Sequence, residues 1–194
     1  MKQFRLIALA AVLVAPVISA DEIPTDDLEA RAAASRAAVK TFAQNLQGEL
    51  QAAMKAGGPI NAISVCNEKA PAIAAAVSEA QGWSVGRTTL KPRNADNAAD
   101  DWERDVLKTF EQRKAAGEDP AKLEFFELIG DNGSREFRYM KAIGIAKDAP
   151  CLACHGTDIA PEVSAKLKAL YPDDQAVGYK TGDIRGAFTI RQPM

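Results

Sequence analysis

The pentapeptide Cys151-Leu152-Ala153-Cys154-His155 carries the most specific chemistry in the chain. In a Cys-x-x-Cys-His motif, the two thiols add to the two vinyl groups of a haem, and the histidine after the second cysteine can bind the iron. The motif therefore predicts one haem c, attached covalently through Cys151 and Cys154, with His155 as an axial ligand of the iron.

Two other interpretations of the same cysteines need no haem. The pair could be the redox couple of a thiol oxidoreductase, which needs a thiol of low pKa at the start of a helix. It could also be a structural disulfide in an exported protein. Neither alternative gives a role to the adjacent histidine, so we expect a cytochrome.

The ligand on the other side of the iron is less clear from the residues. His155 is the only histidine in the chain, which excludes ligation by two histidines and leaves Met, Cys, Lys, the N-terminus, water or no ligand. Met54 and Met140 lie where core packing explains them, and Met194 is the C-terminal residue. Cys66 would be an unpaired thiol in an exported protein, open to oxidation unless it is buried or bound to metal. Burial as a small apolar side chain also explains Cys66, so both roles stay open.

Three basic residues add candidates for contacts with a haem. Arg87, Lys91 and Arg93 lie close together in the sequence and could pair with haem propionates. Such clusters are also common as solvated surface charge, so the same residues could have no binding role.

The first twenty residues are typical of an export signal. Two basic residues precede an apolar run over 6–18, and the small residues Ser19-Ala20 end the segment. The run is short for a membrane span and Pro16 interrupts it, although an uncleaved anchor is the alternative. We therefore expect residues 1–20 to be cleaved and residues 21–194 to form a single c-type haem domain, periplasmic or otherwise exported, with no membrane association.

Composition excludes one broad class of partner. The chain of 194 residues has a formal net charge of −2 at pH 7, which does not suit nucleic acid. Its length is enough to bury one core around a cofactor.

Apolar periodicity predicts helices first and strands later. The expected helices run from Asp26 to the Gly57-Gly58-Pro59 break, from Ile60 to a bend at Pro71, over Ala72–Ala80, over Asp101–Ala115 with Asp101 as the cap, and over Pro161–Leu170. The expected strands are Trp83–Thr89, Lys122–Ile129 and Arg135–Ile143 in a hairpin around 130–133, and Gly186–Ile190. This order predicts an α+β fold in which an antiparallel sheet packs with N-terminal helices and the haem lies against the sheet.

Three segments around the haem motif carry a family resemblance. They are Ala62-Ile63-Ser64-Val65-Cys66 through Ala74, Gly86-Arg87-Thr88-Thr89 through Trp102-Glu103, and Tyr171-Pro172-Asp173 through Ala187. Together with the motif they resemble the Tll-like c-type haem domain family, formerly a domain of unknown function, over most of the chain from about Ala62 to Ile190. Asn94-Ala95 departs from the usual Asn-Pro of the family, which affects only the rigidity of that loop.

The resemblance implies more than the residues alone. It implies a PAS-like sensory fold and an iron held between the histidine of the motif and a distant cysteine, which falls on Cys66 in this chain. Tyr179 and Arg185 become further candidates for haem contacts, because they lie in the matched C-terminal segment.

Ligation by His155 and Cys66 would lower the reduction potential of the iron relative to Met/His ligation, because a thiolate donates negative charge. Both axial positions would be filled, so we do not expect an enzyme. One hypothesis is a redox or gas sensor that releases Cys66 on reduction, binds CO or NO, and signals to a separate partner. The alternative is an electron-transfer cytochrome that keeps its ligands and docks to a redox partner protein.

Overall fold

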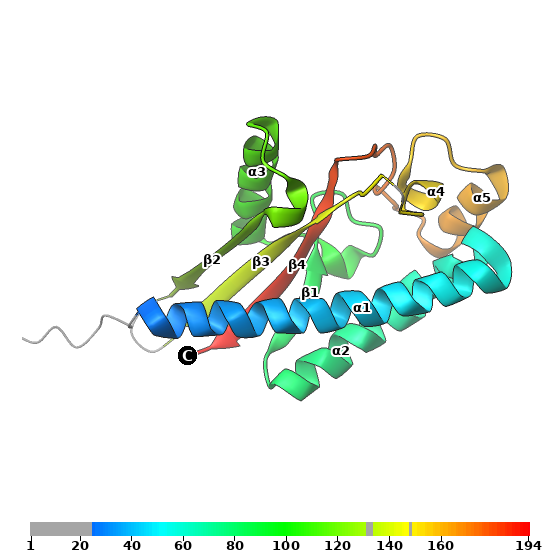
Figure 1. Ribbon diagram of the computed structural model, residues 1–194. Coiled ribbons are helices and arrows are strands. Elements are labelled where there is room, and N and C mark those ends of the chain that lie inside the picture. Colours follow the sequence, from blue (N-terminus) through cyan, green and yellow to red (C-terminus); the bar gives the residue numbers. More distant parts are fainter. Residues whose placement is uncertain (1–24, 131–133, 148) are drawn as a thin grey trace, which may run out of the picture.

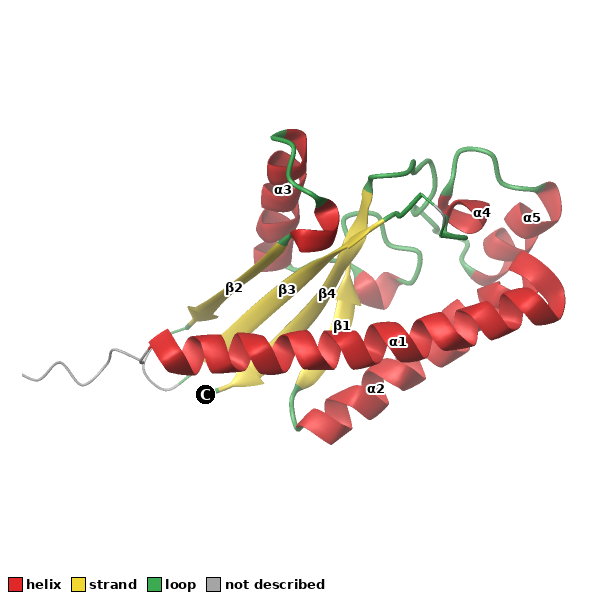
Figure 2. Ribbon diagram, in the orientation of Figure 1, coloured by secondary structure: helices red, strands yellow, loops and turns green. Residues whose placement is uncertain are grey.

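The computed structural model describes residues 25–130, 134–147 and 149–194. The predicted signal peptide and the central residues of the predicted hairpin turn lie outside these ranges. Figures 1 and 2 show a sheet with the long helix α1 (Thr25–Ser64) and α2 (Ala70–Gln81) along one face, and α3 (Asp101–Ala115) against the other. The short helices α4 (Leu152–His155) and α5 (Pro161–Leu170) lie beyond one end of the sheet, beside the C-terminal part of α1. Within the described ranges, no helix is long and apolar enough to cross a membrane.

Among the described residues, four strands form one antiparallel sheet. β1 (Ser84–Thr88), β2 (Glu124–Ile129), β3 (Glu136–Gly144) and β4 (Ile184–Pro193) are arranged in the order β1-β4-β3-β2. The α+β class, the antiparallel sheet and the N-terminal helices packed on it are confirmed, and so are the hairpin strands β2 and β3.

The last strand is longer than its sequence pattern predicts. The predicted strand ends at Ile190, before the polar Gln192, but Gln192 is buried within β4. Its side-chain amide donates to Ser35 Oγ at 2.9 Å and to the Arg31 carbonyl at 3.2 Å. A buried amide with such partners is stable inside a fold, and α1 provides them here.

The predicted break at Gly57-Gly58-Pro59 is confirmed as a kink within α1. Gly58 has a φ of 68° and a ψ of −159°, a conformation that glycine adopts without steric strain. The predicted bend at Pro71 is wrong. Pro71 lies in the first turn of α2, where its missing N–H is tolerated, and the irregular backbone comes earlier, as a π-helix over Val65–Lys69.

Two other boundaries differ from the sequence prediction. The N-cap of α3 is Asp100 and not Asp101: the Asp100 side chain accepts from the Glu103 backbone N–H, and the Glu103 side chain accepts in return from the Asp100 N–H. This capping box explains the shift of one residue. α4 was not predicted as a helix, whereas the bounds of α5 are confirmed.

Both faces of the sheet are packed. On one face, α1 and α2 bury a cluster centred on Phe42, Val77 and Tyr139. On the other face, α3 buries a second cluster centred on Phe110, Leu123 and Met140.

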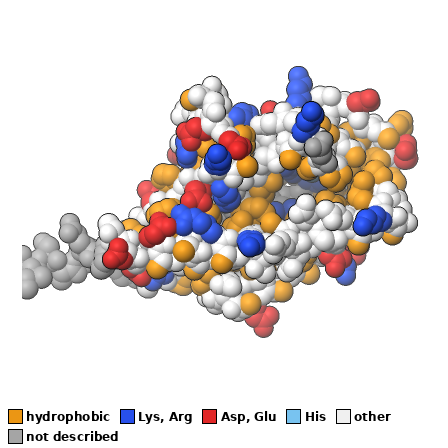
Figure 3. Space-filling model, viewed as in Figure 1, with side chains coloured by type: hydrophobic (Ala, Val, Ile, Leu, Met, Phe, Trp, Pro, Cys, Tyr) orange, Lys and Arg blue, Asp and Glu red, His pale blue; other side chains and the backbone are white. Residues whose placement is uncertain are grey.

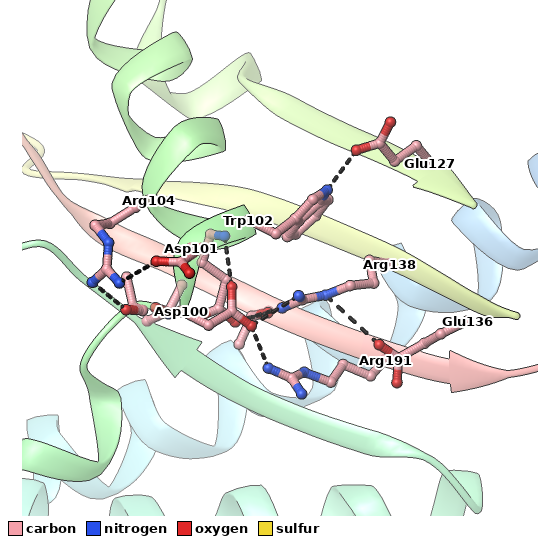
Figure 4. Close-up of polar contacts among 12 residues, drawn as sticks. Asp100, Asp101, Trp102, Arg104, Glu127, Glu136, Arg138 and Arg191 are labelled. Carbon is pink, nitrogen blue, oxygen red and sulfur yellow. Dashed lines mark hydrogen bonds and ion pairs between the residues drawn. The ribbon is translucent and has the colours of Figure 1, made fainter. Parts of the chain in front are cut away.

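A buried ion-pair network fixes the start of α3 to the sheet (Figure 4). Arg138, on β3, donates to Asp100 at 2.8 Å and to Glu103 at 3.0 Å, and its guanidinium lies 4.2 Å from the centre of the Trp102 ring. Glu103 also accepts from the Thr88 and Thr189 hydroxyls at 2.8 and 2.7 Å. Each buried charge in this network therefore has partners of opposite charge.

Neutralising Glu103 should destabilise the fold. Glu103→Gln leaves the Arg138 guanidinium in the interior without its most buried counter-charge, so we expect a loss of about 3 kcal/mol in the free energy of unfolding. The matched substitution Glu111→Gln, on the exposed side of α3, should cost less than about 1 kcal/mol. Urea unfolding of both variants measures the difference, and equal stabilities would contradict the assigned role of the network.

Candidate haem-binding site

α4 carries the Cys-x-x-Cys-His motif as a single helical turn. The His155 N–H donates to the Cys151 carbonyl at 2.9 Å, which closes the turn and places the cysteines and the histidine around one short axis. Cys151 and Leu152 pack against the cluster formed by Ile145, Ala176 and Tyr179. α4 is thus held by side-chain packing on the segment that leads into β4.

The imidazole of His155 has a defined tautomer. Its Nδ1 lies 2.7 Å from the Ala176 carbonyl oxygen, which can only accept, so the proton of the neutral ring is on Nδ1. Burial is the largest cause that lowers the pKa of His155 to about 3, and the positive charges of the nearby Arg185 and Arg93 contribute to this value. The ring is therefore neutral at pH 7 with Nε2 free to donate its lone pair, which is the form that binds a metal.

Arg93 holds the carbonyl that orients His155. Its Nε donates to Asp174 at 2.9 Å, and its Nη2 donates to the carbonyls of Cys154 and Ala176 at 2.6 and 3.2 Å. Asp174 in turn accepts from the Ala176 N–H at 2.8 Å. The side chains of Arg93 and Asp174 are only 7% and 11% exposed. This buried ion pair therefore fixes α4 relative to the segment that contains Asp174 and Ala176.

Arg185, Tyr179 and Lys91 form the outer side of the same region. Arg185 Nε lies 3.3 Å from His155 Nδ1, but Nδ1 already carries a proton, so this is a close approach of two donors and not a hydrogen bond. Arg185 is held by a bond to Thr89 Oγ1 at 3.1 Å. Tyr179 meets the imidazole edge to face at 6.3 Å between ring centres, and Lys91 lies over the Tyr179 ring at 4.5 Å.

Cys66 lies on the π-helix that joins α1 to α2. An inserted residue of this kind is uncommon and is found frequently at functional sites.

The fold brings Cys66 near the motif. Burial is the largest cause that raises the pKa of the Cys151 and Cys154 thiols, and the negative charge of a Cys66 thiolate adds to the rise in both. The same charge acts with burial to raise the pKa of Tyr171 to about 12. Ile63, three residues before Cys66, is buried in the same cluster as Tyr171, and Cys154 packs against that cluster. Cys66, the motif cysteines and Tyr171 therefore lie around one region.

This region fits a covalently held haem. All three cysteines are free thiols, and His155 has its Nε2 available. Figure 3 shows a hollow between α1 and the segment that carries α4, with hydrophobic and basic side chains along its walls. An apolar hollow lined with cations suits a porphyrin, which has an apolar ring and two carboxylates.

A separate cavity of about 510 Å³ borders the Cys66 segment. Asn67, Arg93 and Tyr171 contribute to its wall.

The methionines stay with the roles that their periodicity predicts. Met140 is fully buried in the cluster under α3, Met54 is half-buried on α1, and Met194 is exposed.

The sequence missed three groups of this region. The Ala176 carbonyl and Asp174 carry no pattern that marks them, because one is a backbone atom and the other is one acidic residue among many. Tyr171 could have been found, since it begins the C-terminal segment that carries the family resemblance. Arg87 lies within β1, in agreement with the predicted strand Trp83–Thr89.

The fold has a solved counterpart. A crystal structure of the cyanobacterial haem-protein Tll0287 matches with a TM-score of 0.63 and 22% sequence identity, over 89% of this chain and 98% of that chain. The two proteins thus share an α+β fold with a long N-terminal helix.

Residues 21–193 match the Tll0287-like family, and the chain belongs to this family. The family resemblance noted in the sequence is confirmed. No curated protein matches the chain.

The buried neutral state of His155 predicts a pH dependence of stability in a haem-free form. In a Cys151→Ser/Cys154→Ser variant, the unfolded chain takes up a proton at His155 near pH 6.5, whereas the folded chain takes it up only near pH 3. Stability is therefore full above pH 6.5 and falls as the pH decreases, by about 2 kcal/mol between pH 7 and pH 5.

Urea unfolding across this pH range measures the effect. Adding His155→Gln to the same variant should remove this part of the slope and leave the part that other groups cause. Identical slopes with and without His155 would contradict the assigned burial.

Proposed function

We propose that the protein is an exported monohaem c-type cytochrome that acts as a redox or gas-responsive sensor. Cys151 and Cys154 would hold one haem c through thioether bonds, with His155 and Cys66 as the axial ligands. The leading support is the convergence of Cys66 on the motif, since these residues come from opposite parts of the chain. Membership of the Tll0287-like family and the shared fold with a haem protein agree with this proposal.

The thiols do not suit the alternative of a thiol oxidoreductase. Such an enzyme needs an attacking thiol whose pKa is lowered towards neutrality. Burial raises the pKa of both Cys151 and Cys154, so neither thiol is activated for exchange. A raised pKa is compatible with thiols that react only once, when a cofactor is attached.

The proposal assigns a separate task to each ligand. The haem supplies a one-electron ferric/ferrous couple when it is bound. His155 offers Nε2 while Nδ1 donates to Ala176, and this bond keeps the ring from turning. Cys66 offers negative charge, which stabilises the ferric state. With both positions filled, no site is left open for a substrate, and we propose no enzymatic reaction.

Two features of the Cys66 segment favour a sensor over an electron carrier. The π-helix holds one residue more per turn than its neighbours, so it can change register without unfolding α1 or α2. The adjoining cavity, which Asn67 and Pro71 line, gives this segment room to move. A simple electron carrier keeps the same ligands in both states and needs neither feature.

The remaining parts of the proposal follow from the sequence. Residues 1–20 would be a cleaved signal peptide, and residues 21–194 would form one periplasmic or otherwise exported domain. A sensor would act on a separate signalling partner, whereas an electron carrier would dock to a redox partner protein.

Replacing Cys66 should change the spectrum without loss of the haem. In Cys66→Ala the thioether bonds remain, so a pyridine haemochrome assay should still give one haem c per chain. The low-spin ferric thiolate signature in EPR should disappear, because the sulfur ligand is gone.

Met54→Leu is the matched control, since it removes another sulfur from the same helical region. It should keep the spectrum of the wild type. A thiolate signature that survives in Cys66→Ala would rule out Cys66 as the ligand.

CO binding separates the sensor from the electron carrier. If Cys66 is protonated and released on reduction, the dithionite-reduced protein should give a CO difference spectrum between pH 6 and pH 8. Cys66→Ala should bind CO at least about tenfold faster, because ligand release no longer precedes binding. A wild-type protein that shows no change with CO across this range would instead support the electron carrier.

A further inference from the structure

Arg87 places a positive charge on an apolar face of the sheet. It follows Val85 by two residues on β1, so both side chains are directed towards α1 and α2. Its cross-strand neighbour on β4 is Phe188, whose ring packs against Phe42 at 5.4 Å between ring centres. The Arg87 guanidinium itself lies 5.7 Å from the centre of the Phe42 ring.

Arg87 differs from the other arginines near His155. Arg93 is paired with Asp174, and Arg185 donates to Thr89. Among the described residues, Arg87 makes no hydrogen bond or ion pair, although its side chain is half-buried. The guanidinium has five N–H donors, and a contact with an aromatic face at this distance satisfies none of them.

On the other face of the sheet, a buried guanidinium is paired with carboxylates. Arg138 is 3% exposed and is neutralised by Asp100 and Glu103. A buried cation without such partners is costly, so a fold that keeps one usually has an anion beside it. Arg87 should therefore have an anion beside it.

Two protein groups near Arg87 could carry negative charge. Burial lowers the pKa of Arg87, while the charges of Cys66 and Tyr171 raise it. Tyr171 stays neutral at physiological pH because its own pKa is raised to about 12. If Cys66 binds the iron, its charge is shared with the metal. A planar guanidinium also matches the geometry of a carboxylate better than that of a single sulfur atom.

We propose that Arg87 holds a propionate carboxylate of the haem, as the counter-charge that its apolar surroundings otherwise lack. The inference rests on the haem of the proposed function and assigns one residue to a defined part of that group. Arg87 is thus a cofactor-binding residue, whereas Arg93 is a positioning residue that acts through the Ala176 carbonyl.

The test compares Arg87→Gln, Arg87→Lys and the control Arg104→Gln in the haem-loaded protein. Arg104 lies on α3, against the opposite face of the sheet, and its side chain is 46% exposed. Resonance Raman spectra report the propionate bending band, and redox titration reports the reduction equilibrium of the iron.

We expect Arg87→Gln to shift the propionate band and to move the reduction equilibrium between threefold and tenfold towards the ferric form, because a positive charge near the iron is lost. A tenfold change corresponds to about 59 mV. Arg87→Lys keeps the charge, so it should restore the equilibrium while only part of the band returns, since lysine lacks the two-pronged geometry. Arg104→Gln should match the wild type in both measurements.

A propionate band that is the same in Arg87→Gln and in the wild type would overturn the inference. If the thiolate EPR signature changed at the same time, Arg87 would lie against Cys66 instead. Either outcome leaves the proposed function intact, because that proposal fails only if the wild-type protein carries no haem or shows no Cys66 signature.

Discussion

The packing of α5 on the C-terminal part of α1 is the contact on which the candidate site depends. Ile63 on α1 is buried with Val163 and Leu167 of α5, and Cys154 packs against the same cluster. Cys66 follows Ile63 by less than one helical turn, so this cluster sets its distance from the motif. Closing so long a segment of chain costs conformational entropy, and the burial of these apolar side chains offsets it. A haem ligated by both segments would add a second link between parts that the apolar cluster has already brought together.

The positive charges around His155 and the negative charge of Cys66 would shift the reduction potential of a bound haem in opposite directions. Arg93, Arg185 and Arg87 all lower the pKa of His155 through their positive charge. The same cations would favour the ferrous form of a bound haem, whereas a thiolate favours the ferric form. The reduction potential would then depend on how much of the positive charge is neutralised within the site. Asp174 neutralises Arg93, and a propionate at Arg87 would neutralise another, which leaves Arg185 beside the imidazole.

Much of the fold could be predicted from the sequence, because the apolar periods of the long helices and the hairpin are strong. The Gly57-Gly58 kink, Gly82 at the end of α2 and the bounds of α5 follow from local rules of glycine, proline and helical spacing. One error came where a distant contact decides the structure: Gln192 is buried in β4 beside Ser35 of α1. The shift of the cap from Asp101 to Asp100 follows instead from the local capping box with Glu103, and Arg138 holds the other Asp100 oxygen. In the site, the Cys-x-x-Cys-His motif could be found from the sequence alone. The hydrogen bond to the Ala176 carbonyl could not, because a backbone acceptor does not depend on the residue type.

The position of Cys66 also suggests how a change at one ligand would reach the rest of the fold. The π-helix runs directly into α2, and α2 is tied to β1 through Ser78, whose hydroxyl accepts from the Val85 N–H at 2.9 Å. Arg87 is two residues further along the same strand. If the π-helix relaxed to an α-helix, the helical register of the residues after it would shift by one position. α2 would then have to rotate or slide against β1. Cys66 and Arg87, the two residues proposed to contact different parts of the cofactor, thus lie at the two ends of a single helix–strand unit. Ligand release at one end would therefore alter the contact at the other through packed elements, with no need for a flexible linker.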